Sequence, residues 1–368
     1  MHIHVIARDI QRHDAVGNFC HQIRSFLAAR GYEVSLVAEN CHPDDRLLID
    51  RLEDIIPQIA TDDLILFHFS TADPAFPVVA AVDCPKILYF HNITPERFFS
   101  SVEERNANLV RLGLEQRPLA AKFDLLMANS RVTARSLHEG LAAADRNRIS
   151  EADIIICPPL IGLDRWTAVA EQQAPAGIDF RTVLYVGRLA PNKGMDLLIE
   201  GFARLAATDR STRLACVGGS PDSSGTSALM EKIAALEPSV GRRIRLIHGA
   251  SDGTLKSIYK KAGVCASMSQ HEGFGIPLVD ALVFDKPLVI NADPGMMETA
   301  GEAAIVVDAL NPTVVAAALA AALDDAATRA RLASARRDRL ETLRHLADGH
   351  LILSAVNQAR THPRAHLI

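Results

Sequence analysis

The sequence predicts an α/β protein with two doubly wound parallel sheets. Short apolar runs alternate with amphipathic helical patterns along most of the chain, and this alternation is typical of parallel βαβ units. The 368 residues exceed one ordinary core and fit two domains of about 150–200 residues each. A stretch rich in proline, glycine and polar residues near the middle separates two sets of such units.

The first half contains six predicted strands. They are short apolar runs near His2–Ala7, Glu33–Ala38, Asp63–Phe69, Lys86–Phe90, Asp124–Ala128 and Asp153–Cys157. Between the first two, the apolar spacing over 17–31 predicts a helix, and Gly31 is a suitable residue to end it.

The second half repeats this rhythm with five predicted strands. They lie near Thr182–Val186, Arg213–Val217, Arg243–Ile247, Val264–Ser267 and Pro287–Ile290. The two segments Pro158–Trp166 and Glu171–Gly177 form the predicted linker. We therefore expect domains at 1–165 and 178–345.

The end of the chain has a different composition. Residues 311–323 are alanine-rich with a helical pattern, and residues 328–346 carry many arginines. Residues 351–359 form a last apolar segment that predicts one more helix. We expect this helix, at about 348–368, to pack back on the first domain.

Composition excludes several classes of protein. The net charge of −5 argues against a nucleic-acid-binding protein. The six cysteines are scattered without a C-x-x-C pair, which favours buried free thiols and argues against structural zinc. No secretory signal is evident, and no apolar stretch reaches the ~18–20 residues of a membrane span. The expected location is the cytoplasm.

Two runs in the second half carry the chemistry of a ligand site. Each reads as a strand, a polar loop with glycine, and a helix; the first loop carries Arg188 and Lys193, and the second carries Glu272 and Asp280. Open α/β sheets bind ligands at the carboxyl ends of their strands. Cations there suit a diphosphate and carboxylates suit sugar hydroxyls, so the pair of loops predicts a nucleotide-sugar site.

Several motifs resemble one enzyme family. They are 185–194 (YVGRLAPNKG), 271–277 (HEGFGIP) and 294–304 (PGMMETAGEAA), with 90–95 (FHNITP) and 127–130 (MANS) in the first half. In order and spacing they are similar to the retaining glycosyltransferases of family four, over about residues 1–345. The resemblance implies the GT-B fold, in which two Rossmann-like domains face each other across a cleft.

The resemblance also implies roles for the catalytic residues. Arg188 and Lys193 would hold the donor diphosphate and stabilise the charge of the leaving nucleotide. Glu272 would meet the transferred sugar. The family places a second glutamate where this chain has Asp280, which would bind the ribose hydroxyls. His91 would lie beside the donor sugar and the acceptor and stabilise the transition state.

Further donor-binding residues follow from the same likeness: Gly17 in the loop after the first strand, Gly187, Gly249 near the base, and the loop Gly273, Phe274, Gly275 and Ile276 before a helix. The alternative for Arg188 and Lys193 is a pair of solvated charges in a polar turn. His68 is either structural or lines the acceptor site. Asn129 and Ser130 are interpreted as capping the next helix, and Glu298 as a donor contact or an exposed carboxylate.

The predicted function is a retaining, metal-independent hexosyltransferase without a cofactor. It would move a hexose, with mannose preferred, from a GDP- or UDP-linked donor to a saccharide or lipid-linked acceptor in polysaccharide or glycolipid synthesis. The basic and apolar stretch 96–122 favours peripheral membrane contact slightly over an ordinary surface helix. The alternatives are a nucleotide-sugar epimerase of the same fold and a catalytically silent nucleotide-sugar-binding partner.

Overall fold

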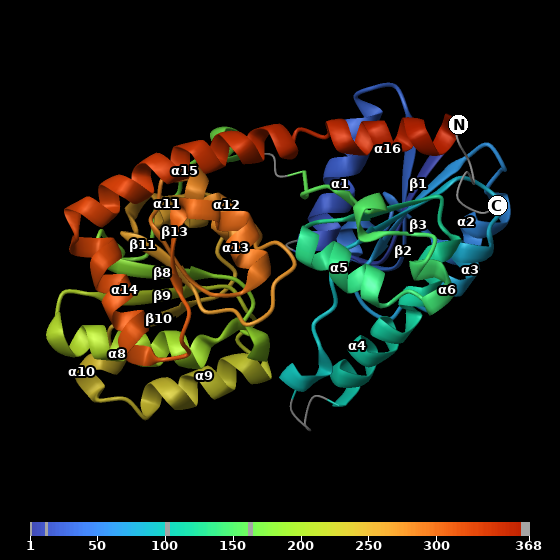
Figure 1. The fold of residues 1–368 in the computed structure, drawn as a ribbon. Coiled ribbons are helices and arrows are strands. Elements are labelled where there is room, and N and C mark those ends of the chain that lie inside the picture. Colours follow the sequence, from blue (N-terminus) through green and yellow to red (C-terminus); the bar gives the residue numbers. More distant parts are fainter. Residues whose placement is uncertain (1, 12–13, 100–103, 161–164, 362–368) are drawn as a thin grey trace. The chain divides into compact units, whose positions relative to one another are not determined.

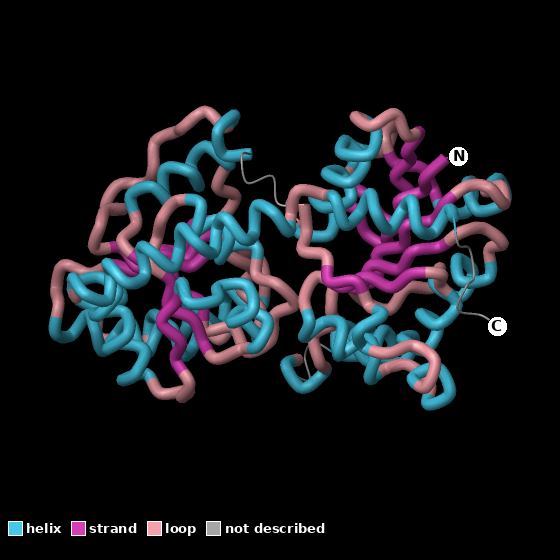
Figure 2. Tube along the Cα trace, turned by 45° about the horizontal axis from the view of Figure 1, so that its top comes forward, coloured by secondary structure: helices cyan, strands magenta, loops and turns pink. Residues whose placement is uncertain are grey.

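The computed structural model describes residues 2–11, 14–99, 104–160 and 165–361. The chain divides into two compact units, each described here by itself. The first comprises Met1–Gly162 and His345–Ile368, and the second comprises Leu163–Arg344. Figure 2 shows that the strands of each unit gather in one sheet flanked by helices.

The first unit is built on a seven-stranded sheet in the order β3-β2-β1-β4-β5-β6-β7, in which every pair is parallel. Its strands are β1 His2–Ile10, β2 Glu33–Cys41, β3 Ile49–Arg51, β4 Leu64–Phe69, β5 Lys86–Phe90, β6 Leu125–Ala128 and β7 Ile155–Ile156. Its helices are α1 Ala15–Ala28, α2 Leu52–Ile55, α3 Phe76–Ala81, α4 Glu104–Gln116, α5 Arg131–Glu139, α6 Ala143–Arg146 and α16 His350–Thr361.

Successive strand residues point to opposite faces of this sheet, and helices pack on both faces, so the side chains on both faces are buried. Val5 and Tyr89 belong to a core that includes residues of α1 and α16. Ile6 and Phe67 belong to a second core that includes residues of α3, α4 and α5. The central strands β4 and β5 therefore read as nearly continuous apolar runs, and Figure 1 shows the helices of this unit around its sheet.

The second unit is built on a six-stranded parallel sheet in the order β10-β9-β8-β11-β12-β13. Its strands are β8 Thr182–Val186, β9 Arg213–Val217, β10 Ile244–Ile247, β11 Val264–Ser267, β12 Leu288–Asn291 and β13 Ala304–Val307. Its helices are α7 Arg165–Ala168, α8 Met195–Thr208, α9 Ser224–Ala234, α10 Pro238–Gly241, α11 Asp252–Lys261, α12 Ile276–Val283, α13 Pro294–Ala300, α14 Pro312–Asp324 and α15 Ala326–Leu346.

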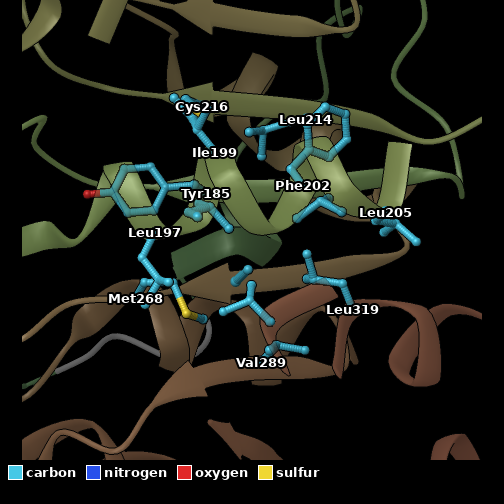
Figure 3. Packing of buried hydrophobic residues seen from close by; sticks show 14 of the residues in the cluster. Tyr185, Leu197, Ile199, Phe202, Leu205, Leu214, Cys216, Met268, Val289 and Leu319 are labelled. Atoms are coloured by element: carbon cyan, nitrogen blue, oxygen red, sulfur yellow. The ribbon is translucent and has the colours of Figure 1, made fainter. Parts of the chain in front are cut away.

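The core under α8 and α14 holds the strand β8 in place. Figure 3 shows Tyr185 and Val289 from the sheet packed with Phe202 from α8 and Leu319 from α14. A Cβ on Gly201 would lie 2.4 Å from a methyl carbon of Val315, so glycine is what lets α8 and α14 approach closely. This packing fixes the strand whose carboxyl end carries Arg188.

The predicted α/β class with two doubly wound parallel sheets is confirmed. Two strands were missed in the sequence, β3 and β13. Both are edge strands, of three and four residues, and such short segments carry too little periodicity to be recognised. The last helix, α16, contributes Ile352 and Val356 to the core of the first unit.

Part of the predicted linker packs on the second unit. Lys256 in α11 donates to the backbone carbonyl oxygens of Trp166, at 2.5 Å, and Val169, at 2.8 Å. The stretch 161–164 lies outside the described residues.

All six cysteines are free and five of them are buried, as predicted. Among the described helices, none has the length and apolarity that crossing a membrane requires.

Candidate functional site

The loop after β8 and the loop after β11 meet where the strand order of the second sheet reverses, which is its switch point. The strand order reverses between β8 and β11, because β8 continues to β9 on one side and pairs with β11 on the other. Arg188 and Lys193 follow β8, and Glu272 follows β11. Ligands of open α/β sheets bind outside the carboxyl ends of the strands at such a point. The fold therefore brings together the cations and the carboxylate that the sequence singled out.

Lys193 and Glu272 form an ion pair. The Nζ atom of Lys193 lies 2.7 Å from Oε1 of Glu272, and the two side chains are 12% and 18% exposed. A partly buried pair is screened less by water and salt than a surface pair. The two groups are therefore held at a defined place, with Lys193 neutralised by the carboxylate of the neighbouring loop.

Asn192 ties the two loops to each other. Its Nδ2 donates to the carbonyl oxygen of His271 at 3.0 Å, and its own carbonyl oxygen accepts from the amide of Gln270 at 2.8 Å and from Oγ of Ser269 at 3.1 Å. We did not single out Asn192 in the sequence. Its position directly before Lys193 in the quoted motif was the available signal.

Gly194 permits the close approach of these loops. It adopts a left-handed conformation with φ of 63°, and a Cβ there would lie 1.9 Å from the carbonyl oxygen of Met268. Any other residue would both strain the backbone and push the β11 loop away. Gly194 is also the residue from which α8 begins.

The remaining cation and the start of α12 complete this edge. Arg188 is exposed, forms no ion pair within the described ranges, and its carbonyl oxygen accepts from the Tyr185 hydroxyl at 2.6 Å. Gly275, with φ of 86°, begins α12, and Ile276 is its first residue. The loop 273–275 thus places backbone N–H groups and the positive end of the helix dipole beside the pair.

Asp293 lies against Glu272 from a third loop, after β12. It caps α13 by accepting from the amide of Met296 at 2.9 Å. Burial raises the pKa of Asp293 to about 6, and the nearby carboxylate of Glu272 adds to this rise. A Cβ on Gly295 would lie 2.2 Å from the carbonyl oxygen of Glu272, so α13 begins in close contact with that residue. The sequence did not reveal Asp293. Glu298 lies within α13, and its backbone carbonyl oxygen accepts a hydrogen bond from Nη2 of Arg339.

Asp280 has partners that the sequence did not suggest. Oδ2 accepts from Nη2 of Arg165 at 2.7 Å and Oδ1 from Nε1 of Trp166 at 2.8 Å, and the residue is 4% exposed. Burial raises the pKa of Asp280, and the charge of Arg165 opposes the rise. The carboxylate thus anchors the start of the second unit on α12. Contact of Asp280 with a ribose stays a prediction.

Two other predicted glycines have local explanations. Gly249 follows β10 with φ of 61°, and a Cβ there would meet nothing within 4 Å, so its backbone conformation rather than crowding explains the glycine. Gly187 follows β8, and its amide donates to the carbonyl oxygen of Val217 at 3.0 Å. Phe274 is buried, and its carbonyl oxygen accepts from Thr299.

His68, which is buried, and His91, which is partly buried, form a pair in the first unit. His68 is the residue before the last of β4, His91 directly follows β5, and Nδ1 of His68 lies 2.8 Å from Nε2 of His91. Burial lowers the pKa of His68 to about 3 and that of His91 well below its usual value, and for His91 the neighbouring His68 adds to the decrease. Both imidazoles are therefore neutral near pH 7.

Gly17 is not in the loop after β1, as the sequence analysis expected. It lies in the first turn of α1, and its amide donates to Oδ2 of Asp14, the capping residue, at 3.3 Å. A Cβ there would lie 2.2 Å from the carbonyl oxygen of Gln11, which explains the glycine. Ser130 caps α5, as predicted, whereas Asn129 donates to the carbonyl oxygen of His91 at 3.2 Å.

Polar groups without partners gather where β4 and β5 end. Asp73 is 2% exposed, and its Oδ2 accepts no hydrogen bond from any described residue. The buried Nδ2 of Asn92 likewise donates no hydrogen bond to any described residue. Asn92 adopts a left-handed φ of 76°, which is strained for a residue with a side chain. Arg8, from β1, donates to the carbonyl oxygen of Ala72 beside Asp73. The sequence analysis missed Arg8 and Asp73, although each lies at or just after the end of an apolar strand.

The stretch 96–122 offers less free basic surface than its sequence suggests. Arg111 pairs with Glu115 at 2.7 Å, and Arg117 donates to the carbonyl oxygen of Ser136 at 2.5 Å. Gln116 forms two hydrogen bonds of 2.8 Å with the backbone of Asp73, which attach the end of α4 to the segment after β4. Among the described residues no group of His, Cys, Asp and Glu could hold a metal ion.

Comparison with known proteins shows what the second unit is similar to. Residues 170–339 match the family described as glycosyl transferases group 1. The chain is 32% identical over 221 residues to the D-inositol 3-phosphate glycosyltransferase of Corynebacterium efficiens, covering 56% of this chain and 51% of that protein. For the Corynebacterium glutamicum protein of the same name the identity is 30% over 253 residues, covering 66% and 59%. The chain thus spans about half the length of the curated relatives it matches.

Solved structures show the same fold. Anabaena Alr3699/HepE in complex with UDP and glucose has a TM-score of 0.71 at 16% identity, covering 98% of this chain and 99% of that one. WaaG, described as a glycosyltransferase involved in lipopolysaccharide biosynthesis, has a TM-score of 0.65 at 17% identity, covering 95% and 99%. The GT-B fold that the sequence resemblance implied is confirmed.

Proposed function

We propose, from the premise that residues 170–339 belong to the group 1 glycosyltransferases, that this protein moves a hexose from a nucleotide diphosphate sugar to a hydroxyl group. The observation that carries the proposal is the Lys193–Glu272 pair, held at 2.7 Å where β8 and β11 diverge. An ammonium group and a carboxylate at one switch point offer the two chemistries that a donor diphosphate and its sugar require.

In the proposed donor complex the diphosphate replaces Glu272 as the partner of Lys193. Arg188, which is exposed and has no ion pair in the described parts of the chain, supplies the second cation. Cleavage of the bond between the anomeric carbon and the β-phosphate oxygen leaves negative charge on that oxygen. Cations already in place stabilise this charge without reorganising, which lowers the barrier and makes a metal unnecessary.

Glu272, released from Lys193, then accepts hydrogen bonds from hydroxyls of the transferred sugar. The backbone N–H groups of 273–276, at the start of α12, add donors for phosphate or sugar oxygens. Gly249 follows β10 and contributes backbone contacts to the base, and Gly187 belongs to the same edge of the sheet.

The residues of the first unit serve the acceptor and the transferred sugar. The pKa of His91 lies well below its usual value, so near pH 7 its imidazole is too weak a base to take up a proton and acts by hydrogen bonding. Asp73 and Asn92 bind the acceptor in this proposal, because each has a buried polar atom that forms no hydrogen bond with a described residue. The acceptor proton passes to the departing phosphate on the same face of the sugar, which gives retention of configuration.

The donor we expect is GDP-mannose, with UDP-linked hexoses as the competing class. The first preference rests on the likeness of 90–95 to the family motif. The second rests on similar folds whose crystals contained UDP and glucose. The proposed acceptor is a saccharide or a lipid-linked saccharide in polysaccharide or glycolipid synthesis, reached at the inner membrane face through peripheral contact.

A panel of nucleotide sugars tests the proposal without knowledge of the acceptor. The full chain is incubated with GDP-mannose, UDP-glucose, UDP-galactose and UDP-N-acetylglucosamine in the presence of EDTA, and release of nucleotide diphosphate is measured. One donor should be cleaved, and Lys193→Met should slow cleavage by about 100- to 1000-fold.

Lys261→Met is the matched control, because Lys261 is exposed on the last turn of α11, away from the switch point. It should keep the wild-type rate. Cleavage of no donor, or an unchanged rate in Lys193→Met, would contradict the proposal. An epimerised nucleotide sugar without released nucleotide would identify an epimerase instead.

A further inference from the structure

A pocket lies at the opposite end of the strands that carry the proposed donor loops. It has a volume of about 420 Å³ and is bounded by residues just before β8, β11 and β12 and by one face of α15. Lys193 and Glu272 follow the carboxyl ends of β8 and β11, whereas Phe180 and Pro287, which line this pocket, precede the amino ends of β8 and β12. It is therefore distinct from the donor site.

Small residues keep this space open. Ala326, Ala330 and Ala333 are spaced along one face of α15 and present only methyl groups to it. Before β11, a Cβ on Gly263 would lie 1.8 Å from the carbonyl oxygen of Phe180, so only glycine permits that approach. A volume of this size falls within the range of small-molecule sites, roughly 300–1,000 Å³.

Arg336 is a buried cation with unused hydrogen-bonding capacity. It is 5% exposed, and its Nε donates to Oδ1 of Asp285 at 2.7 Å. Its Nη1 is buried and finds no acceptor in the described part of the chain. A buried N–H without an acceptor costs free energy, and an incoming anion would remove that cost.

Two more cations line the same pocket. Arg329 lies with its Cζ 4.7 Å from the centre of the Phe180 ring, and Lys286 uses one of its protons on the carbonyl oxygen of Lys260, at 2.7 Å. Burial lowers the pKa of Lys286, and the charge of Arg336 adds to the decrease. Against these three cations the lining contains one carboxylate, Asp285, so the pocket carries a net excess of positive charge.

We propose that this pocket binds a phosphate monoester of a small metabolite, with the phosphate between Arg336, Arg329 and Lys286. A dianion matches the excess charge of three cations and one carboxylate, and guanidinium groups present paired N–H donors that fit phosphate oxygens. The apolar surfaces of Phe180 and Pro287 would contact the organic part. The inference is independent of the proposed donor and acceptor.

Calorimetric titration of the full chain tests this site. The donor site is first silenced with Arg188→Met and Lys193→Met, and inorganic phosphate is then titrated at constant ionic strength. One phosphate should bind per chain, and Arg329→Gln together with Lys286→Gln should weaken it by about tenfold or more. Both residues are at least partly exposed, so the fold should tolerate these changes.

Arg331→Gln is the control: it removes one positive charge, against two in the double variant, from an exposed residue of α15 that does not line the pocket. Its phosphate affinity should stay within about twofold of the parent. Glucose 6-phosphate and AMP, titrated in the same way, distinguish a sugar phosphate from a nucleoside monophosphate by which binds more tightly. Absence of saturable binding by all three, or an equal loss in Arg331→Gln, would overturn the proposal.

Discussion

Lys193 and Glu272 hold opposite charges at a distance of 2.7 Å, and only one of them is needed to bind a phosphate. Removal of the carboxylate leaves the ammonium group free for the diphosphate. Removal of the ammonium group leaves an unpaired carboxylate that repels it. The two substitutions should therefore separate nucleotide binding from sugar transfer, which a purely structural ion pair would not do.

We predict that Glu272→Gln binds the nucleotide diphosphate at least as tightly as the wild type, while its transfer rate falls by about 100-fold. Lys193→Met should lose both. Equilibrium binding of GDP and UDP and the rate of donor cleavage check this. Equal losses of nucleotide affinity in the two variants would show that the pair is only structural.

The burial of His68 makes the first unit sensitive to acid. The pKa of His68 is lowered to about 3 in the folded chain, against about 6.5 in an unfolded one. The unfolded state therefore binds more protons below pH 6.5, and stability is present above that pH and lost as the pH falls. Each pH unit in this range costs about 1.4 kcal/mol for His68 alone.

His68→Phe should remove this part of the acid sensitivity. Between pH 7.5 and pH 5, its free energy of unfolding should fall by about 2 kcal/mol less than that of the wild type. Denaturant titrations at both pH values measure the difference. His345→Gln, at an exposed histidine, should follow the wild type. Identical pH dependence of His68→Phe and wild type would contradict a neutral buried His68.

At the scale of elements, the approach of the β8 and β11 loops depends on Gly194. Gly194 and Gly249 have nearly the same φ, 63° and 61°, but a Cβ would clash with a backbone oxygen only at Gly194. Alanine at either position pays roughly 1–2 kcal/mol for the left-handed conformation. At Gly194 it must also displace the loop that carries Glu272.

We therefore predict that Gly194→Ala is destabilised by clearly more than Gly249→Ala, by about 1 kcal/mol or more. Thermal unfolding of the two variants measures this. Gly194→Ala should in addition lose donor cleavage, because Lys193 and Glu272 move apart. Equal stability of the two variants would show that the two loops do not approach closely.

The sequence analysis recovered the elements that local patterns define. The sequence singled out Arg188, Lys193 and Glu272 because each lies in a glycine-bearing loop after an apolar strand, and their roles stay predictions. The partners of Asp280 could not be found, because Arg165 lies 115 positions away along the chain. Only tertiary packing brings such residues together. Gly17 was misplaced because glycine marks loops and close helix packing equally well.

At the scale of the molecule, the first unit is completed by the end of the chain. Ile352, Ala355, Val356 and Ala359 of α16 are each at most 1% exposed in its core. The apolar pattern of 351–359 predicted the helix, and we expected it to pack back on the first domain; that it lies against β4 and β5 followed only from the structure. The second unit is one continuous segment and owes none of its sheet to α16.

Truncation after residue 346 should therefore affect the two units differently. The core of the first unit loses its cover over β4 and β5, whereas the nucleotide-binding edge of the second unit is left intact. We predict that the truncated chain gains an earlier unfolding transition but keeps its affinity for nucleotide diphosphate. Calorimetric unfolding and equilibrium binding check this. A single transition at the wild-type temperature would contradict the role of α16.

The most direct test of the account is a crystal structure of the full chain with its nucleotide-sugar donor. We predict that the diphosphate lies within hydrogen-bonding distance of Nζ of Lys193, with the Lys193–Glu272 pair opened and Glu272 bound to a sugar hydroxyl. A donor bound elsewhere, with that pair still at 2.7 Å, would contradict it.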